Sequence, residues 1–168
     1  HGLAKVPNLI IVKDRDVATG WPVFHSSVTT QNEYLLLNGT AAKATLSGMF
    51  GSAMPTSSVF GQTVGAAINA NSKFMALCFT DVPGYQKIGS YTGNGSADGV
   101  CITCGFAPRL VIIKKIDTTG DWIMFDSARS TSNVKGEYLF ANSSAAGATA
   151  SLIDFTSTGF KLRANDGT

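Results

Sequence analysis

Three cysteines are the residues of this sequence that could bind a metal or exchange a disulfide. Cys101 and Cys104 form a C-x-x-C arrangement, and only Cys78, His1 and His25 could add further ligands, from elsewhere in the chain. A zinc site of this spacing needs a second pair of cysteines or histidines close by, and residues three apart in a strand point to opposite faces. We therefore predict no metal site and no cofactor, with the cysteines as small buried apolar residues.

A histidine and several acids could carry proton-transfer chemistry. His25 precedes two serines, and Asp126 precedes Ser127 in a similar stretch, but neither lies in a nucleophile-elbow motif. We interpret both as polar strand ends, with no catalytic residues, and predict that the protein is not an enzyme. A polysaccharide depolymerase is a rival that requires two carboxylates about 5–9.5 Å apart; its nearby candidates are Asp121, Asp126 and Glu137.

Asp14 and Asp16 could contribute oxygen ligands to calcium, yet calcium needs several oxygens at regular spacing in one loop. Asx-turns that cap the loop backbone explain them more simply. Trp21 and Trp122 could each present a ring face to a sugar if exposed, or anchor a core if buried. Their place in a repeated pattern favours the core.

That pattern is an internal duplication. Residues 7–16 (PNLIIVKDRD) match residues 108–117 (PRLVIIKKID), and Trp21 precedes Trp122 by 101 residues. Residues 33–45 match residues 137–149 at a spacing of 104. Such repetition indicates an array of modules. We predict an all-β fold of two tandem antiparallel β-sandwich modules, jelly-roll-like and of about 100 residues each, with residues 1–86 in the first and 87–168 in the second.

The elements of the modules follow from β-branched and aromatic runs bounded by turn residues. The two long apolar runs, at 9–13 and 110–114, indicate strands that are buried on both faces or central in a sheet. A short helical turn is possible in each of the two Ala/Thr/Ser segments. We expect a recurring ion pair at the rim between Lys13 or Lys114 and Glu33 or Glu137. The expected strands are 9–13, 21–24, 34–38, 59–60 and 73–79, then 110–114, 122–125, 138–142 and 159–162; the possible helical turns are 40–46 and 144–152, and a turn is expected at 67–71.

The second module has no counterpart of the apolar strand at 73–79. An unpaired strand edge promotes pairing with another chain. We expect this edge to be completed either by a continuation of the polypeptide or by a strand from a neighbour.

Composition excludes several classes of protein. Charged residues make up 14% of the chain with a formal net charge of +2, against about 25% charged residues in soluble proteins, and no basic stripe suits nucleic acid. No apolar run reaches the roughly 20 residues of a membrane helix. The chain shows no signal peptide or initiator Met, so we expect a piece of something longer; three cysteines favour synthesis in a reducing cytoplasm.

One stretch is more specific than composition. Residues 87–99 (KIGSYTGNGSADG), followed by Gly105-Phe106-Ala107-Pro108 and an apolar run ending in lysines, resemble a repeat module of bacteriophage tail-fibre and related virion proteins. The segment from Trp122 to Arg129 is similar to a later part of that module, and residues 159–162, followed by Asn165-Asp166, are similar to its late strand. The first copy departs from it, with His25 and Val28 where the second has Asp126 and Arg129. Within the signature, Gly93-Asn94-Gly95 predicts a turn with positive φ, and Ser96 and Asp98 could bond its backbone.

The resemblance implies a structural virion protein made in the host cytoplasm, a tandem fibre segment for assembly and host attachment. Its partners would be copies of itself, as a homo-oligomer, neighbouring virion proteins, or a host surface glycan. Alternatives are a lectin-like carbohydrate-binding module and a self-assembling filament subunit. Candidate contact loops are 14–20 and 117–121, with Tyr85 near the join. The candidate binding residues are Trp21, Tyr91, Asn94, Trp122, Asp126 and Arg129.

Overall fold

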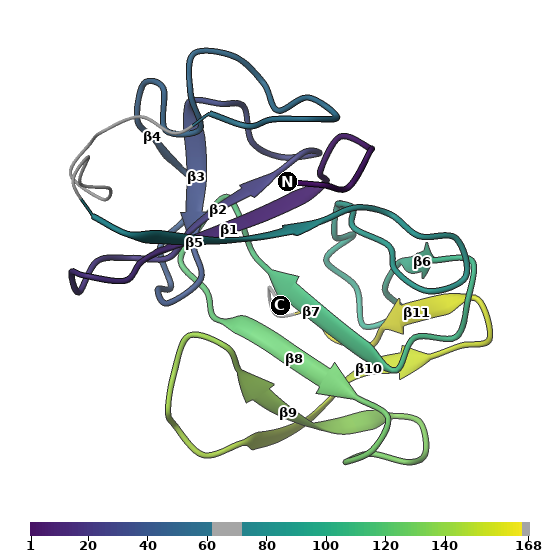
Figure 1. Cartoon of the computed structure of the whole chain (residues 1–168). Coiled ribbons are helices and arrows are strands. Elements are labelled where there is room, and N and C mark those ends of the chain that lie inside the picture. Colours follow the sequence, from purple (N-terminus) through teal and green to yellow (C-terminus); the bar gives the residue numbers. More distant parts are fainter. Residues whose placement is uncertain (62–71, 166–168) are drawn as a thin grey trace. The chain divides into compact units, whose positions relative to one another are not determined.

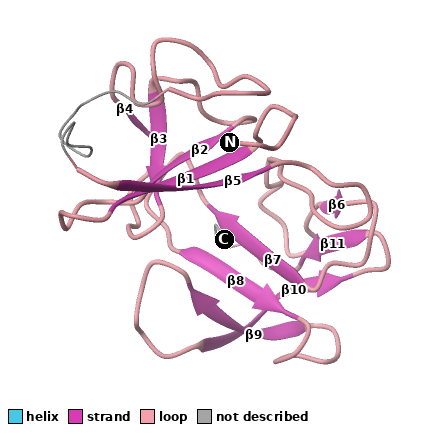
Figure 2. Cartoon of the chain, in the orientation of Figure 1, coloured by secondary structure: helices cyan, strands magenta, loops and turns pink. Residues whose placement is uncertain are grey.

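The computed structural model describes residues 1–61 and 72–165, and every element in them is a strand (Figures 1 and 2). The chain divides into two compact units. Unit 1 comprises residues 1–81, 88–90 and 116–119, and unit 2 comprises residues 82–87, 91–115 and 120–168. The predicted boundary at residue 86/87 falls where the chain alternates between the units, and the turn expected at 67–71 lies outside the described residues.

Unit 1 contains one antiparallel sheet in the order β4-β3-β2-β1-β5. β1 is central, and its side chains alternate between half-buried and buried, as expected for a strand with one face on the core. β1 pairs with β5 from Leu9 opposite Phe79 to Asp14 opposite Phe74. The strands are β1 (Leu9–Asp14), β2 (Pro22–His25), β3 (Glu33–Leu36), β4 (Ala44–Thr45) and β5 (Phe74–Phe79).

The core of unit 1 lies on one face of this sheet. Ile10 and Val12 of β1 and Phe24 of β2 are buried together with Met49 and Phe50, which come from the loop after β4. The rings of Phe24 and Phe50 meet edge to face with centroids 5.5 Å apart, a favoured aromatic geometry. The loop thus covers the sheet with its own apolar side chains.

Unit 2 contains a six-stranded antiparallel sheet in the order β6-β11-β10-β9-β8-β7. The sheet curls (Figure 1), and Val111 of β7 shares a core cluster with Leu162 of β11. The expected all-β fold of two antiparallel modules is confirmed. The strands are β6 (Cys101–Thr103), β7 (Leu110–Lys114), β8 (Trp122–Asp126), β9 (Lys135–Phe140), β10 (Ala148–Phe155) and β11 (Gly159–Leu162).

The two sheets share a four-stranded meander, β1 to β4 in unit 1 and β7 to β10 in unit 2. Equivalent backbone hydrogen bonds recur: the N–H of Leu37 donates to the carbonyl of Trp21, and that of Ala141 to Trp122, both at 2.9 Å. The meander is extended by β5 beside β1 in unit 1, and by β11 and β6 beside β10 in unit 2. The duplication seen in the sequence is therefore a duplication of backbone structure, with different additions.

Two element predictions are wrong. The Ala/Thr/Ser segments form β4 and β10 rather than helical turns, because their backbones pair with β3 and β9, with Ala44 opposite Tyr34 and Ala148 opposite Tyr138. Residues 59–60 form no strand. Instead the backbone N–H of Thr56 donates to the carbonyl of Val59 at 2.8 Å, which closes a turn.

β7 differs from β1 although their sequences are similar. The prediction of a central strand is correct for β1 and wrong for β7, which lies at the sheet edge. Leu110 and Ile112 of β7 are 56% and 49% exposed, while Val111 and Ile113 face the core. Within the described residues, β8 is the only strand that pairs with β7, as the lack of a second-module counterpart of β5 predicted.

Candidate functional site

The hairpin between β1 and β2 contains a cluster of polar side chains in unit 1. The amide oxygen of Asn38 accepts the backbone N–H of Trp21 at 2.9 Å. The Lys13 ammonium lies 5.9 Å from the centre of the Trp21 ring, within the range of a cation–π contact. It also donates to the carbonyls of Asp14 at 2.5 Å and Val17 at 3.1 Å. The strand end, the loop and the indole are thereby held together.

An open hollow lies beside this cluster, lined by residues 13–21 and Asn38. The Asp14 carboxylate is buried and accepts the backbone N–H groups of Asp16 and Val17 at 2.9 and 3.2 Å. Burial alone would raise the pKa of Asp14, but these donors, the Ser72 side chain and the charge of Lys13 together outweigh it and lower the pKa. Asp14 is therefore an ionised Asx-turn cap, as expected, and the described residues contain no group of three ligands for a metal.

Unit 2 repeats this arrangement with a deeper tryptophan. The amide oxygen of Asn142 accepts the backbone N–H of Trp122 at 2.7 Å, while its NH2 group donates to Asp121 at 2.7 Å. The Lys114 ammonium donates to the carbonyl of Lys115 at 2.6 Å. Burial lowers the pKa of Lys114, an effect opposed by the charge of Asp121. Asn38 and Asn142 thus occupy equivalent positions in the two modules, and so do Lys13 and Lys114.

The tryptophans themselves differ. Trp122 is only 8% exposed, so its ring belongs to the core and offers no open face to a sugar. Trp21 is half-buried and lines the hollow. The predicted core position is confirmed for Trp122, whereas Trp21 is exposed enough to contact a ligand at the surface.

The expected ion pair between Lys13 and Glu33 does not form. Glu33 pairs with Lys43 at 2.7 Å and accepts the backbone N–H of Thr30 at 2.9 Å. The hydrogen bond from Lys43 is the main cause of the lowered pKa of Glu33. Lys13 points instead to backbone carbonyls, because it is the penultimate residue of β1 and lies beside the hairpin loop.

Asp126 and Arg129, both predicted binding residues, bind each other. One oxygen of Asp126 accepts the backbone N–H groups of Ala128 and Arg129 at 2.9 and 2.8 Å, and the other contacts the Arg129 guanidinium at 2.6 and 2.7 Å. The backbone N–H of Arg129 is the main reason that the pKa of Asp126 is lowered. The pair closes the turn after β8, and Asp126 stays ionised.

In unit 1, His25 takes the place of Asp126 and closes the turn after β2 with a neutral side chain. Its ring Nδ1 accepts the backbone N–H of Ser27 at 3.3 Å, as Asp126 accepts that of Ala128. The hydroxyl of Thr29 bonds both the N–H and the carbonyl of His25, at 2.9 and 3.0 Å. His25 is therefore a polar strand end, as the sequence indicated, with its pKa lowered by burial.

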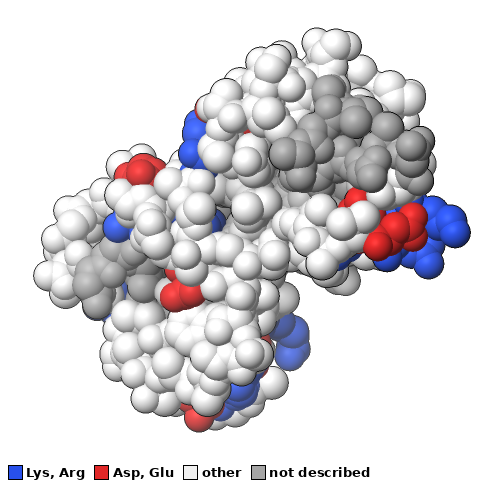
Figure 3. Space-filling view, turned by 90° about the vertical axis from the view of Figure 1, so that its left-hand side faces the viewer, with Lys and Arg blue, Asp and Glu red and all other residues white. Residues whose placement is uncertain are grey.

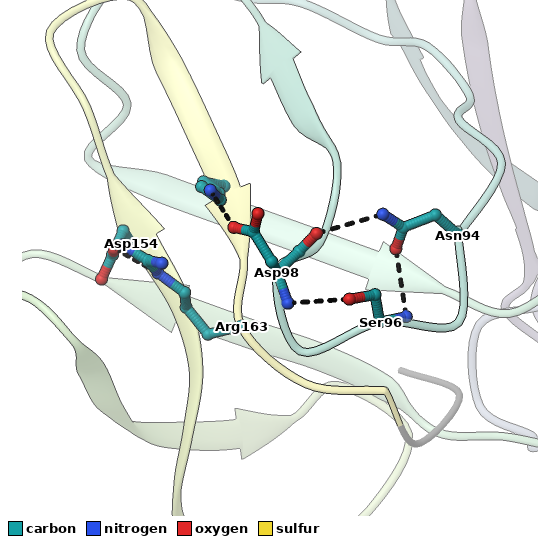
Figure 4. Close-up of polar contacts among 6 residues, drawn as sticks. Asn94, Ser96, Asp98, Asp154 and Arg163 are labelled. Carbon is teal, nitrogen blue, oxygen red and sulfur yellow. Dashed lines mark hydrogen bonds and ion pairs between the residues drawn. The ribbon is translucent and has the colours of Figure 1, made fainter.

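The glycine-rich signature forms a closed turn (Figure 4). Asn94 accepts the N–H of Ser96 at 3.2 Å and donates to the carbonyl of Asp98 at 3.1 Å, while the hydroxyl of Ser96 accepts the N–H of Asp98 at 3.1 Å. Gly95 has a φ of 65°, the predicted left-handed conformation. The Asp98 carboxylate does not bond the turn but pairs with Lys161 of β11. Asn94 is thus an exposed residue whose amide already serves the turn.

A second ion pair lies beside this turn in Figure 4. The guanidinium of Arg163 donates to the buried carboxylate of Asp154 through Nε at 2.6 Å. Asp154 belongs to β10, and Arg163 follows β11 directly. The pair therefore joins β10 to the residue that follows β11.

Two tyrosines near the signature have opposite environments. Tyr91 is half-buried, packs edge to face on Phe160 with centroids 6.3 Å apart, and has its pKa raised by burial. Tyr85 is 79% exposed on a tight turn closed by reciprocal backbone bonds of 2.9 Å between Val82 and Gln86. Tyr91 is placed as a packing residue and Tyr85 as a surface residue.

The geometry supports neither carboxylate catalysis of the depolymerase type nor cysteine chemistry. Among the depolymerase candidates, Asp121 is bonded by Asn142, and Asp126 by Arg129. Cys101 is exposed, contrary to the expectation of burial, because it lies on the edge strand β6. Burial raises the pKa of the Cys78 and Cys104 thiols, which disfavours the reactive thiolate.

Charged side chains are few and of mixed sign on the face drawn in Figure 3, with no basic stripe. In the part of the chain that is described, no helix could cross a membrane. The recurring asparagines Asn38 and Asn142 were not among the predicted site residues, although both end a matched E-Y-L segment and could have been found by that recurrence.

The fold and these clusters define a tandem antiparallel β-sheet protein whose recurring polar side chains mainly close turns. Comparison with protein families assigns the chain, over residues 1–168, to the family described as a domain of unknown function, DUF7483. The chain belongs to that family. No curated protein and no solved structure matches it.

Proposed function

We propose that this chain is a non-enzymatic structural segment of a bacteriophage fibre, located in the virion, which contributes to fibre assembly and attaches to the host surface through its loops. The observation that carries the proposal is the repeated frame. Each module holds its tryptophan with an asparagine, at 2.9 Å in unit 1 and 2.7 Å in unit 2. A four-stranded meander that recurs with the same asparagine–tryptophan hydrogen bond, while its loops vary, suits a protein that spaces or displays binding loops.

The hydrogen bonds made by the signature residues support the same proposal. Asn94 and Ser96 close a turn, and Asp126 and Arg129 close another. Side chains that are hydrogen-bonded within turns stabilise loops and are not available as catalytic groups. The resemblance to fibre modules in these same residues is what gives the proposal its phage context.

Attachment would be shallow and would gain strength from repetition. Tyr85 offers an exposed ring on a turn held by two backbone bonds, and residues 14–20 offer a loop capped by Asp14. Weak contacts of this kind sum when several copies bind at once, with gains of roughly 10²–10⁴ in avidity. Partners would be further copies, neighbouring virion proteins and a host glycan.

Staining of a panel of bacterial strains with the fluorescently labelled chain, displayed on a multivalent carrier, tests this function. We expect saturable staining of a subset of strains, reduced by Tyr85→Ala and unchanged by the control Tyr34→Phe. The surface polysaccharide should stay at its original length during the incubation. Release of shorter oligosaccharides, or equal staining of every strain by both variants, would contradict the proposal.

A carbohydrate-binding module is a second candidate, and the hollow beside half-buried Trp21 favours it. A glycan array should then show binding that Trp21→Ala abolishes, while Asn94→Ala leaves it intact. Absence of binding to every glycan by the unmodified chain would remove this candidate.

A further inference from the structure

We propose that the free edge of β7 binds an extended apolar strand of the β5 type, which adds to the sheet of unit 2 antiparallel to β7. The inference comes from comparing the two modules and stands independently of the phage assignment. β1 and β7 are the same strand of the duplicated meander, but β1 has β5 as a second neighbour, whereas β7 pairs only with β8 in the described residues.

The side chains of β7 are more exposed than those of β1, which a neighbouring strand covers. The outward side chains Leu110 and Ile112 are 56% and 49% exposed, whereas Leu9 and Ile11 at the same positions of β1 are half-buried. The inward side chains follow the same trend. Val111 and Ile113 are 8% and 7% exposed, against 0% and 1% for Ile10 and Val12.

Backbone geometry leaves the edge ready for pairing. The carbonyl of Arg109 accepts the N–H of Ser127 at 3.0 Å, so this carbonyl points toward the β8 side. In an antiparallel ladder these directions alternate along the strand. The backbone groups of Leu110 and Ile112 therefore face away from β8, toward the free edge. An edge of this kind accepts a further strand through main-chain hydrogen bonds.

The established β1–β5 pair defines what the partner must be. In it Leu9 lies opposite Phe79, Ile11 opposite Leu77, and Val12 opposite Ala76. The residues of β5, Phe74 to Phe79 (FMALCF), are all uncharged and apolar. Because Leu110 and Ile112 repeat Leu9 and Ile11, we infer a partner of five or six uncharged apolar residues in extended conformation, with large side chains opposite those two.

A synthetic peptide of residues 73–80, with Cys78 replaced by Ser and a fluorescent label, is the probe. Added to the whole chain, it should bind saturably by fluorescence anisotropy, and the amide of Ile112 should gain protection from hydrogen exchange. The N–H of Arg15 donates to the carbonyl of Lys73 at 2.8 Å, so the odd-numbered residues of β5 direct their backbone toward β1. N-methylation at Leu77 should therefore weaken binding by at least about tenfold, and N-methylation at Ala76 should not.

A variant of the protein gives the matching test from the other side. Ile112→Pro removes the N–H that faces the free edge and leaves the β8 ladder intact, which is tolerated at an edge strand. It should lose peptide binding, while Ile112→Val retains it; circular dichroism and thermal melting confirm that both are folded. The methylated peptides test the same contact without changing the protein.

Several results would overturn the inference. Equal binding of the two N-methylated peptides would show non-specific apolar adsorption. No binding up to the solubility limit of the peptide would show that the edge does not accept this strand. A dimer of the chain that Ile112→Pro disrupts and the peptide fails to displace would show that a second β7, and not a β5-type strand, occupies the edge.

Discussion

The amide oxygen of Asn142 accepts the backbone N–H of Trp122 at 2.7 Å, and this single bond ties the start of β8 to the end of β9. Asn38 makes the same bond to Trp21 at 2.9 Å in unit 1. The side chain reaches across the hairpin to a donor that precedes the regular ladder. A buried core residue, Trp122, is thus held by a polar group from the turn that follows β9.

Replacing Asn142 by Ala should lower the free energy of unfolding of unit 2 by about 1–3 kcal/mol, because the N–H of Trp122 loses its acceptor and Asp121 loses its donor. Urea unfolding followed by Trp fluorescence measures the effect. The exposed residue Ser132 provides the control, since Ser132→Ala should change stability by less than about 0.5 kcal/mol. Equal midpoints for the two variants would show that Asn142 does not hold the tryptophan.

Stability should depend on the protonation of His25. Burial lowers its pKa, and backbone hydrogen bonds and the charge of Asp81 oppose the shift only in part. A group with a lower pKa in the folded state binds fewer protons when folded. Its contribution is therefore complete above the unfolded pKa of about 6.5 and is lost as the pH falls through the lower folded value.

Urea midpoints measured between about pH 8 and pH 5 test this dependence. The variant His25→Asn keeps an acceptor for the N–H of Ser27 and does not titrate, so its midpoint should fall less over that range. Superimposable pH profiles of the two proteins would rule out His25 as the titrating group.

Gly159 is required by the close approach of β11 and β6. A Cβ at this position would lie 1.9 Å from the carbonyl oxygen of Ile102, so Gly159→Ala must displace the strands. We expect a loss of about 2–3 kcal/mol or more in the free energy of unfolding. Gly136→Ala is a matched control in β9, where a Cβ meets nothing within 4 Å. A loss of the same size at both positions would contradict the proposed clash.

Gly95 tests the conformation of the signature turn. Its φ of 65° is costly for a residue with a Cβ, and Gly95→Ala should destabilise the turn by about 1–2 kcal/mol. Hydrogen exchange at the amide of Asp98, which donates to Ser96, reports this opening. Gly93→Ala, at a position with open space and an ordinary φ, should leave that exchange rate unchanged.

The strands of the meander could be predicted because their signals are local. β-branched runs, turn residues and a matched second copy locate β1, β2, β3 and their partners within a few residues. The Asx-turn of Asp14 is equally local, since its acceptor and donors are at most three residues apart. The alanine-rich strands β4 and β10 were missed because small residues show no preference until a partner strand is known.

The sequence alone determined that this protein is a duplicated all-β chain with few charges, because side-chain period and recurrence survive without coordinates. Only the tertiary structure decided that Trp122 is buried while Trp21 lines a hollow, and that β1 is central while β7 is an edge. Nearly identical strands acquire different roles because burial and pairing depend on neighbours distant in the chain, and β5 pairs with only one of them.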